Sequence, residues 1–548
     1  MRTPTCATSL ILLLAVSSHC STALTSETSK AHLPSNLTGG ARKRNLSPYF
    51  ASTSNGNELP REIKQASIFA SASSDTPPLG EVPASLTVGA ITAAMGFVYG
   101  KVLGVCVNTV WHRAPNLLLK QFESLSPTHF ITATCTVGGI LMGLLSSKFS
   151  STFTVADFVA SFSKAPAKAL PESRVHLMPL LLLSLVTSSF GFSVGPEAPM
   201  VCAGALLGSS LAKYWYGSSS EASKSKQEVL AYAGAAGALT AFMGIPMAGS
   251  IFALELTRSN AGLATSSDRA LSPSMLSSIA AIALIRGILL PAKAVGGHFT
   301  YGPIGALSGR AMIATAGICG LGGAFIGTLF HKIVHGFKDI AWPTSAKDNE
   351  TECFSVRRQI MVKSLIGLAV GILSSKFPQT LFWGEGSLQC VVDGQSTAFA
   401  ATKHGLSNFL TSQAQVNPNL PFTSALAAAQ VGVAKLMSIA LACAGKFPGG
   451  IIFPLFFAAA PLAHSTCSFL GSATSSISPV VPLAVMCLMA ATQASVTRTP
   501  LATVLMLSLS ASAGTELSPM LPACLVSSYL GVYLSRKMSK ESYFQYCE

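Results

Sequence analysis

Long apolar stretches recur along the chain, with only short polar connections between them. They cover residues 84–111, 129–147, 175–216, 229–256, 272–292, 311–334, 361–375, 424–444, 450–470, 479–496 and 500–534. A membrane-spanning helix needs about 20 predominantly apolar residues, and most of these stretches approach or exceed that length. Several are too long for one span and contain internal Gly or Pro. This pattern predicts helices that break at membrane depth, with ordinary kinked helices as the alternative.

The amino-acid composition is that of a membrane protein. Of 548 residues, 49% are hydrophobic and only 11% are charged, and the mean hydropathy is +0.51. Soluble domains carry about 25% charged residues. The composition therefore favours a polytopic helical membrane protein.

The net charge of +14 is not concentrated in one block. Residues 1–90 hold seven Lys/Arg and five Asp/Glu, so +12 of the excess belongs to the rest of the chain. There the basic residues are spread over short loops, which is typical of topology determinants and does not indicate nucleic-acid binding. A basic pore mouth that attracts anions by electrostatic steering is the functional alternative.

One carboxylate is isolated in an apolar run. Glu197 is the only Asp, Glu, Lys or Arg in residues 175–212, and it lies between two prolines in Gly-Pro-Glu-Ala-Pro, residues 195–199. An acid at membrane depth is costly, so we expect Glu197 to have a function. Because proline suits the first turn of a helix, we also expect a new helix from about Pro199 toward Tyr216. The free N–H groups of a helix start attract an anion. A carboxylate in that position competes with the anion when ionised and stops competing when protonated, as a gate would.

This motif resembles the Gly-x-Glu-Gly-Pro signature of the CLC family of chloride channels and proton/chloride exchangers, with Ala198 in place of the second glycine. Three further stretches resemble CLC motifs in family order. They are the Pro-Met-Ala-Gly stretch that runs from Pro246 to Glu255, Gly-Gly-Ile-Ile-Phe-Pro at residues 449–454, and a weaker Arg-Thr-Pro-Leu at residues 498–501. Four motifs in order across roughly residues 85–548 are hard to explain by chance, so the chain is identified as a member of this family.

The resemblance implies an all-α polytopic fold: a CLC-type inverted repeat with broken and re-entrant helices. It also implies a homodimer in which each subunit carries its own pore. The partial similarity of residues 246–251 to residues 500–505 agrees with two related halves. The expected function is a passive chloride channel, with a proton-coupled chloride exchanger as the alternative, and the expected partners are chloride or other small anions and the lipid bilayer. We expect no enzyme activity, cofactor or metal, and a purely structural scaffold is the remaining alternative.

The resemblance also assigns functional residues. Glu197 is the expected gate. The expected anion-binding residues are Gly195, Pro196, Ala198, Gly450, Ile451, Ile452, Phe453 and Tyr543. At both isoleucines only the backbone amides are expected to face the anion, while the side chains pack. In relatives a tyrosine near the end of the last helix contributes a hydroxyl; Tyr543 is our candidate and Tyr546 its rival, and an interfacial aromatic anchor is the other interpretation.

One family motif, Gly-Ser-Gly-Ile-Pro, is not found before Glu197. The nearest hydroxyl-rich stretch is residues 150–153, so Ser150 or Ser151 is a candidate for the side-chain oxygen that this motif supplies in relatives. In relatives, this motif determines whether chloride or nitrate is preferred. The anion preference of this chain therefore stays open.

A single position bears on the choice between channel and exchanger. In the family's exchangers, proton entry commonly uses a glutamate directly after the residue that matches Glu255, and this chain has Leu256 there. Leucine cannot bind a proton, so we expect a channel. Glu255 and Pro246 are expected to be structural, with Glu255 paired to groups of a loop or helix end.

The start of the chain has a different character. Residues 1–23 contain Arg2, a short apolar core and small residues, as in a signal peptide. Residues 24–83 are interpreted as a transit-peptide-like or disordered segment, and residues 84–548 as the transmembrane domain, with no C-terminal cytosolic domain. A signal peptide followed by a transit-like segment resembles the two-part address of plastids with extra membranes. We expect a plastid membrane, thylakoid or envelope, with a vacuolar or other endomembrane location as the alternative.

Overall fold

The computed structural model describes most of the apolar part of the chain. The described residues are 81–115, 117, 126–149, 153–162, 173–217, 220–245, 247–261, 269–289, 299–303, 307–343, 352–394, 422, 424–471, 480–511, 517–539 and 543–544. All of them belong to one compact unit, Ser74–Glu548. The predicted signal peptide and nearly all of the transit-like segment lie outside the described residues.

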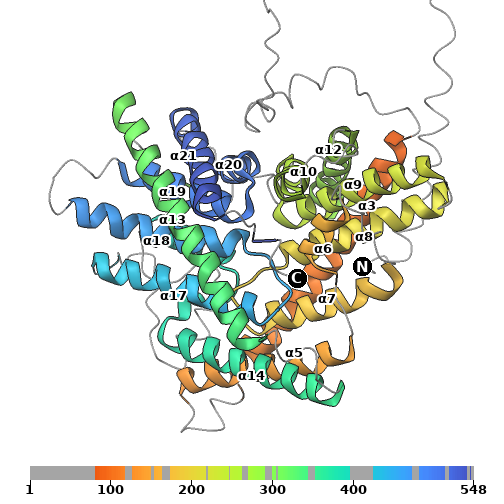
Figure 1. Cartoon of the computed structure of the whole chain (residues 1–548), viewed down its shortest axis with the longest axis horizontal. Helices are drawn as coiled ribbons and strands as arrows, with labels where there is room; N and C mark the ends of the chain where they lie inside the picture. Colours follow the sequence, from red (N-terminus) through yellow and green to blue (C-terminus); the bar gives the residue numbers. More distant parts are fainter. Residues whose placement is uncertain are drawn as a thin grey trace, which may run out of the picture. The chain divides into compact units, whose positions relative to one another are not determined.

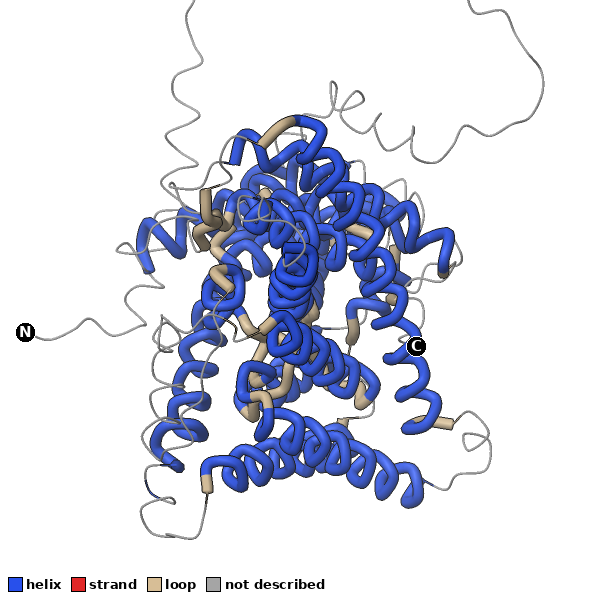
Figure 2. Tube along the Cα trace, turned by 90° about the vertical axis from the view of Figure 1, so that its left-hand side faces the viewer, coloured by secondary structure: helices blue, strands red, loops and turns tan. Residues whose placement is uncertain are grey.

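The regular structure of the described residues is helical throughout, as the colouring of Figure 2 shows. The α-helices are α3 (Glu81–Asn108), α5 (Pro127–Lys148), α6 (Val155–Ser161), α7 (Ser173–Ser189), α8 (Glu197–Tyr216), α9 (Glu221–Met243), α10 (Ala248–Ala261), α12 (Leu271–Ile282), α13 (Gly309–Ala341), α14 (Glu352–Lys376), α15 (Leu388–Val392), α17 (Ala425–Ala444), α18 (Ile452–Gly471), α19 (Val481–Thr497), α20 (Pro500–Leu509) and α21 (Leu517–Met538). The π-helical turns η1 (Thr109–Arg113) and η2 (Ala283–Leu289) continue α3 and α12, and the 3₁₀ turns η4 (Pro378–Thr380) and η5 (Glu385–Ser387) precede α15. The predicted all-α fold class is confirmed.

Three of the longest apolar stretches are each split into two helices. Residues 175–216 form α7 and α8, residues 229–256 form α9 and much of α10, and residues 500–534 form α20 and most of α21. At the end of α9, Gly244 adopts the left-handed conformation with φ of 68°, which a residue with a side chain rarely adopts. The predicted helix breaks are therefore confirmed at these places.

Two groups of three helices form the centres of the two halves of the unit. Helices α3, α9 and α12 contact one another, and so do α13, α19 and α21, and the two groups lie on opposite sides of Figure 1. Both groups pack through glycine. A Cβ on Gly89 of α3 would lie 2.2 Å from the Ser277 carbonyl oxygen of α12, and one on Gly323 of α13 would lie 2.4 Å from the Ala491 Cβ of α19. Close backbone approach through small residues is common between membrane helices, and its recurrence supports two related halves.

Helices α5 and α14 connect the halves, and they lie together at the lower edge of Figure 1. Their seam is also made by glycine. A Cβ on Gly139 of α5 would lie 2.4 Å from the Lys363 carbonyl oxygen, and one on Gly367 of α14 would lie 2.6 Å from the Cys135 carbonyl oxygen. The seam leaves no space for larger residues, so it fixes α14 and its Lys363 relative to the first half.

The protein is an integral, multi-pass membrane protein. Among the described residues, six helical segments are long and apolar enough to cross a bilayer: Glu81–Arg113, Thr128–Lys148, Leu271–Leu289, Gly309–Ala341, Ala425–Ala444 and Ile452–Gly471. Their outward residues are also apolar. On α3, for example, Val98, Val102 and Val105 are 59%, 43% and 65% exposed, and their spacing places them on one face of the helix. Such a face suits lipid rather than water.

Candidate functional site

The chain leaves helical geometry between α7 and α8. Helix α7 ends at Ser189, and Gly191 follows with φ of 81°, where a side chain would be strained. Helix α8 begins at Glu197 with Pro196 at its N-cap. The predicted start near Pro199 was wrong by two residues, because proline is tolerated within a first turn whose N–H groups have no helical partner. Glu197 is therefore the first residue of the helix.

A second break precedes α18, and it meets the first. Gly195 N–H donates to the Gly450 carbonyl oxygen at 2.8 Å, and Gly450 N–H donates to the Gly195 carbonyl oxygen at 2.5 Å. This pair joins the two glycine motifs two residues before each helix begins. The N-termini of α8 and α18 consequently lie beside each other.

Both of these glycines are required by the position of Glu197. A Cβ on Gly195 would lie 2.1 Å from Glu197 Oε2, and a Cβ on Gly450 would lie 2.5 Å from the same atom. The adjacent Gly449 is similarly constrained, since a Cβ there would lie 2.5 Å from Val194 Cγ2. The carboxylate of Glu197 thus lies in the space that side chains at residues 195 and 450 would fill.

The Glu197 carboxylate is fully enclosed. The residue is 0% exposed, and neither oxygen has a hydrogen-bond partner among the described residues. The backbone amides of Glu197 itself and of Phe453, in the first turn of α18, act on it electrostatically. Helix N-termini stabilise negative charge, whereas an ionised carboxylate without hydrogen bonds is costly to bury. Such a group has little to hold it in place once it is neutral.

A cavity of about 410 Å³ is lined in part by Glu197. Its lining includes Lys338 of α13, Lys363 of α14 and Lys446, which precedes α18, and Glu197 is the only acid among its described lining residues. Three of the scattered basic residues therefore converge on one cavity, although they are far apart in the sequence. Among the alternatives for the basic charge, this arrangement supports an anion-attracting mouth for these three lysines.

Polar residues that also line the cavity include Thr154, which the sequence did not suggest, and Tyr543. Thr154 caps α6: its Oγ1 accepts a hydrogen bond from Asp157 N–H at 3.2 Å, and Asp157 Oδ2 accepts one from Thr154 N–H at 2.9 Å. This capping box could have been recognised from Thr-x-x-Asp before an apolar run. Tyr543 also lines the cavity and packs against Phe330. Ser150, Ser151 and Tyr546 lie outside the described residues.

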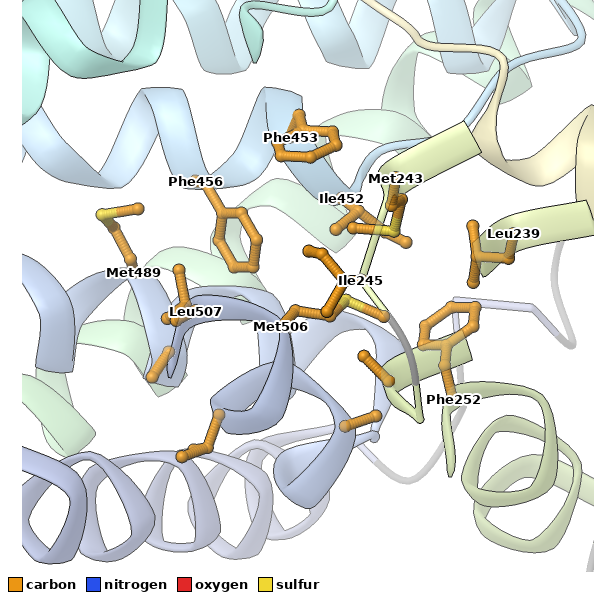
Figure 3. Close-up of a cluster of buried hydrophobic side chains, with 14 of the residues drawn as sticks. Leu239, Met243, Ile245, Phe252, Ile452, Phe453, Phe456, Met489, Met506 and Leu507 are labelled. Carbon is orange, nitrogen blue, oxygen red and sulfur yellow. The ribbon is translucent and has the colours of Figure 1, made fainter. Parts of the chain in front are cut away.

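The side chains of the second motif pack in buried apolar clusters, although Ile451 and Ile452 are also among the residues that line the cavity. Figure 3 shows a buried apolar cluster that joins the start of α18 to the other half of the unit. Ile452 and Phe453 contribute to this cluster, and Ile451 lies in a neighbouring one with Leu455. The other labelled members are Leu239, Met243, Ile245, Phe252, Phe456, Met489, Met506 and Leu507. These positions leave the backbone of the α18 start as its polar surface, in agreement with the expected packing role of the side chains.

The carboxylate of Glu255 lies at the start of another helix. The N–H groups of Leu501 and Ala502, in the first turn of α20, donate to its carboxylate at 3.1 and 2.8 Å. Each half thus contributes to this contact, since Glu255 lies on α10. Leu256 next to it is 0% exposed within the apolar core. Pro246 lies outside the described residues.

One buried cation was missed. Lys435 of α17 is 0% exposed, and its Nζ donates to the carbonyl oxygens of Thr380 and Phe382 at 3.0 and 2.6 Å. It is the only charged residue in residues 424–444. The signal that identified Glu197, a lone charge in an apolar stretch, therefore also marks Lys435.

Comparisons with known proteins agree on one family. The sequence model for a family described as voltage gated chloride channels matches residues 138–531. Three solved structures share the fold: a slow cyanobacterial Cl−/H+ antiporter, a CLC-type fluoride/proton antiporter and a eukaryotic CLC transporter. Their TM-scores are 0.65, 0.58 and 0.59, with 14%, 17% and 14% identity. The matches cover 86%, 84% and 85% of this chain and 97%, 95% and 73% of the respective relatives. No curated protein matches.

Proposed function

Because the chain belongs to the CLC family of voltage-gated chloride channels and related anion transporters, we propose that it is a passive chloride channel whose gate is Glu197. The family consists of channels and transporters and not of enzymes, so membrane transport of anions is its established class. The observation that carries the finer proposal is the position of Glu197. Its carboxylate is buried where two helix N-termini meet, and the residue lines a cavity that three lysines also line.

The gate would act by competition. The helix N-termini and the lysines favour negative charge at this place, whether it comes from chloride or from Glu197. While Glu197 is ionised, its carboxylate fills the site and chloride cannot pass. Protonation removes the charge, the site no longer favours the side chain, and chloride can replace it. Channel opening should therefore increase as the pH falls on the side from which protons reach Glu197.

The expected anion contacts follow from the same geometry. We propose that chloride is bound by the backbone of Gly195, Pro196 and Ala198 on one side and of residues 450–453 on the other. The hydroxyl of Tyr543 would contribute from the cavity. Phe453 and both isoleucines would act through their amides, because their side chains are buried in apolar clusters.

Passive transport is supported by Leu256 and Glu255. Exchange ties each chloride step to a proton step, so protons need carriers on both sides of Glu197. Leu256 cannot carry a proton, and both carboxylate oxygens of Glu255 accept amides of α20. The antiporter names of two structural relatives favour the exchanger, but these relatives are only 14% and 17% identical and share the fold.

Reconstituted vesicles with an imposed chloride gradient test the transport class. The channel dissipates the gradient and produces no uphill proton movement. Sustained proton movement against its gradient would instead establish the exchanger. Glu197→Ala serves as the internal control, because an exchanger must lose proton movement in this variant, whereas a channel retains chloride flux and loses its dependence on pH.

We propose further that the protein is a homodimer with one pore in each subunit. The test mixes wild-type and Glu197→Ala subunits and records single channels. Independent pores predict two current levels within one complex, one dependent on pH and one independent of it. A single current level that depends on both subunits would contradict the proposal.

We also propose a plastid membrane as the location. The support is the combination of signal-peptide and transit-like features in residues 1–83. A fluorescent protein fused after residue 85 should accumulate in the plastid. Labelling of the endoplasmic reticulum or vacuole alone would contradict this location.

A further inference from the structure

The segment between α14 and α15 contacts chain segments on either side of Glu197 in the sequence, at Gly191 before α8 and at the cluster that contains Met200 of α8. It is fixed to both halves of the unit. Phe382 N–H donates to the Gly191 carbonyl oxygen at 3.1 Å, which ties the segment to the chain just before α8. Lys435 of α17 donates to the carbonyl oxygens of Thr380 and Phe382, which ties it to the second half. Because Lys435 is fully buried and shares Thr380 as an acceptor with Ser193, this attachment is well defined.

The same segment places a second carboxylate near the gate. Trp383 Nε1 donates to Glu385 Oε2 at 3.0 Å, and the Trp383 ring packs against a cluster that contains Met200, one turn after Glu197 on α8. Gly384, with φ of 90°, lies directly on the Phe457 ring of α18, since a Cβ there would lie 3.0 Å from that ring. Glu385 is therefore held near the first turn of α8 and the second turn of α18.

Glu385, unlike the three lysines, does not belong to the lining of the basic cavity. It is half-buried, and its charge interacts with that of Glu197. Tyr99 of α3 also interacts with Glu197, and its hydroxyl is hydrogen-bonded to Ser184 Oγ at 2.8 Å. Other titratable groups on the surrounding elements include Lys101, Cys106, Asp157, Cys202, Lys213, His335, Lys338, Lys363, Asp393, Lys435, Cys443, Lys446, His464, Cys467 and Tyr543. Glu385 is thus a carboxylate that interacts with Glu197 and is itself partly exposed to solvent.

We propose that Glu385 is a positioning residue for the gate: its negative charge sets the pH range in which Glu197 takes up the proton that opens the channel. A nearby negative charge makes it harder for Glu197 to stay ionised, so it favours the protonated, open state. This inference rests on the proposed role of Glu197 as the gate. It adds an acid that no motif marks and that lies outside the anion path through the basic cavity.

Glu385→Gln tests the role directly, with chloride flux into vesicles measured across a range of pH. Loss of the charge lets Glu197 remain ionised at more acid pH. The midpoint of the flux curve should consequently move down by about 0.5 to 1 pH unit, the size expected for one charge acting through partly solvated protein. High salt should reduce the difference between variant and wild type, because Glu385 is partly exposed.

Three companion variants separate the charge effect from damage to the fold. Glu385→Asp keeps the charge and should retain the wild-type curve. Trp383→Phe removes the indole donor but keeps an aromatic ring, so it should give a smaller shift in the same direction. Glu228→Gln removes another half-buried carboxylate, on α9, and should leave the curve unchanged.

The outcomes distinguish this inference from the proposed function. An unchanged or more alkaline midpoint in Glu385→Gln would overturn the role of Glu385, and so would an equal shift in Glu385→Asp. Glu197→Ala provides the reference in the same assay. If that variant keeps the wild-type pH dependence, the gate itself is refuted, whatever Glu385 does.

Discussion

The two helices that meet at the site, α8 and α18, have nearly the same backbone arrangement and different first residues. Each begins two residues after a glycine of the Gly195–Gly450 pair, and each directs its N-terminus to the same place. Helix α8 begins with Glu197, whereas α18 begins with Ile452. Both helix starts can attract an anion, but only α8 brings a carboxylate that can take the anion's place. If the proposed roles hold, one duplicated element serves as a binding surface in one half and as a gate in the other.

The strongest test of this comparison is a substitution that displaces the Glu197 carboxylate. In Gly195→Ala the new Cβ would lie 2.1 Å from Glu197 Oε2, so the carboxylate must leave the site. We expect chloride flux at neutral pH to rise and to lose most of its dependence on pH. Gly317→Ala on α13 is the matched control, because a Cβ there meets nothing within 4 Å. A wild-type flux curve in Gly195→Ala would show that the carboxylate does not block the path.

Helices α10 and α20 provide the contrasting case of Glu255, an acid that we expect to stabilise the fold and not to gate. Glu255→Gln weakens the charge-assisted hydrogen bonds to Leu501 and Ala502, at a cost of about 1–2 kcal/mol. The temperature of half-inactivation in detergent should fall, while the pH dependence of flux stays as in wild type. A shifted pH curve with unchanged thermal stability would instead assign Glu255 to transport.

Tyr543 tests the cavity side of the site. Tyr543→Phe removes one hydroxyl and keeps the contact of the ring with Phe330. If the hydroxyl contacts chloride, the half-saturating chloride concentration should rise by about 2- to 10-fold, the usual worth of one hydrogen bond. Concentration dependence of the current measures it, and an unchanged value would leave Tyr543 as a packing residue.

Ile452 provides the smallest and most selective test of the comparison. Ile452→Val removes one buried methylene, so stability should fall by about 0.5–1.5 kcal/mol. The chloride flux and its pH dependence should not change, because the proposed contact with the anion is through the backbone. A change in the relative permeability of chloride and nitrate would show that this side chain faces the anion.

The sequence predicted the helix breaks because proline and glycine restrict local geometry independently of distant contacts. It also singled out the isolated Glu197, and it predicted that Glu255 pairs with groups of a loop or helix end, since an acid in an apolar segment requires a partner or a function. It could not predict the Gly195–Gly450 pair, which joins positions far apart in the chain through tertiary packing alone. Glu385 was missed for a related reason: it lies in a short connection, and its importance comes from the elements on which that connection is folded.

The most direct test of the central claim compares chloride flux in wild type and Glu197→Gln across pH, in vesicles with no proton gradient. Glutamine approximates the protonated side chain in shape and lack of charge. We predict that the variant conducts at neutral pH as wild type does in acid, and that its flux is independent of pH. A variant that retains the wild-type pH dependence would show that Glu197 is not the gate of this protein.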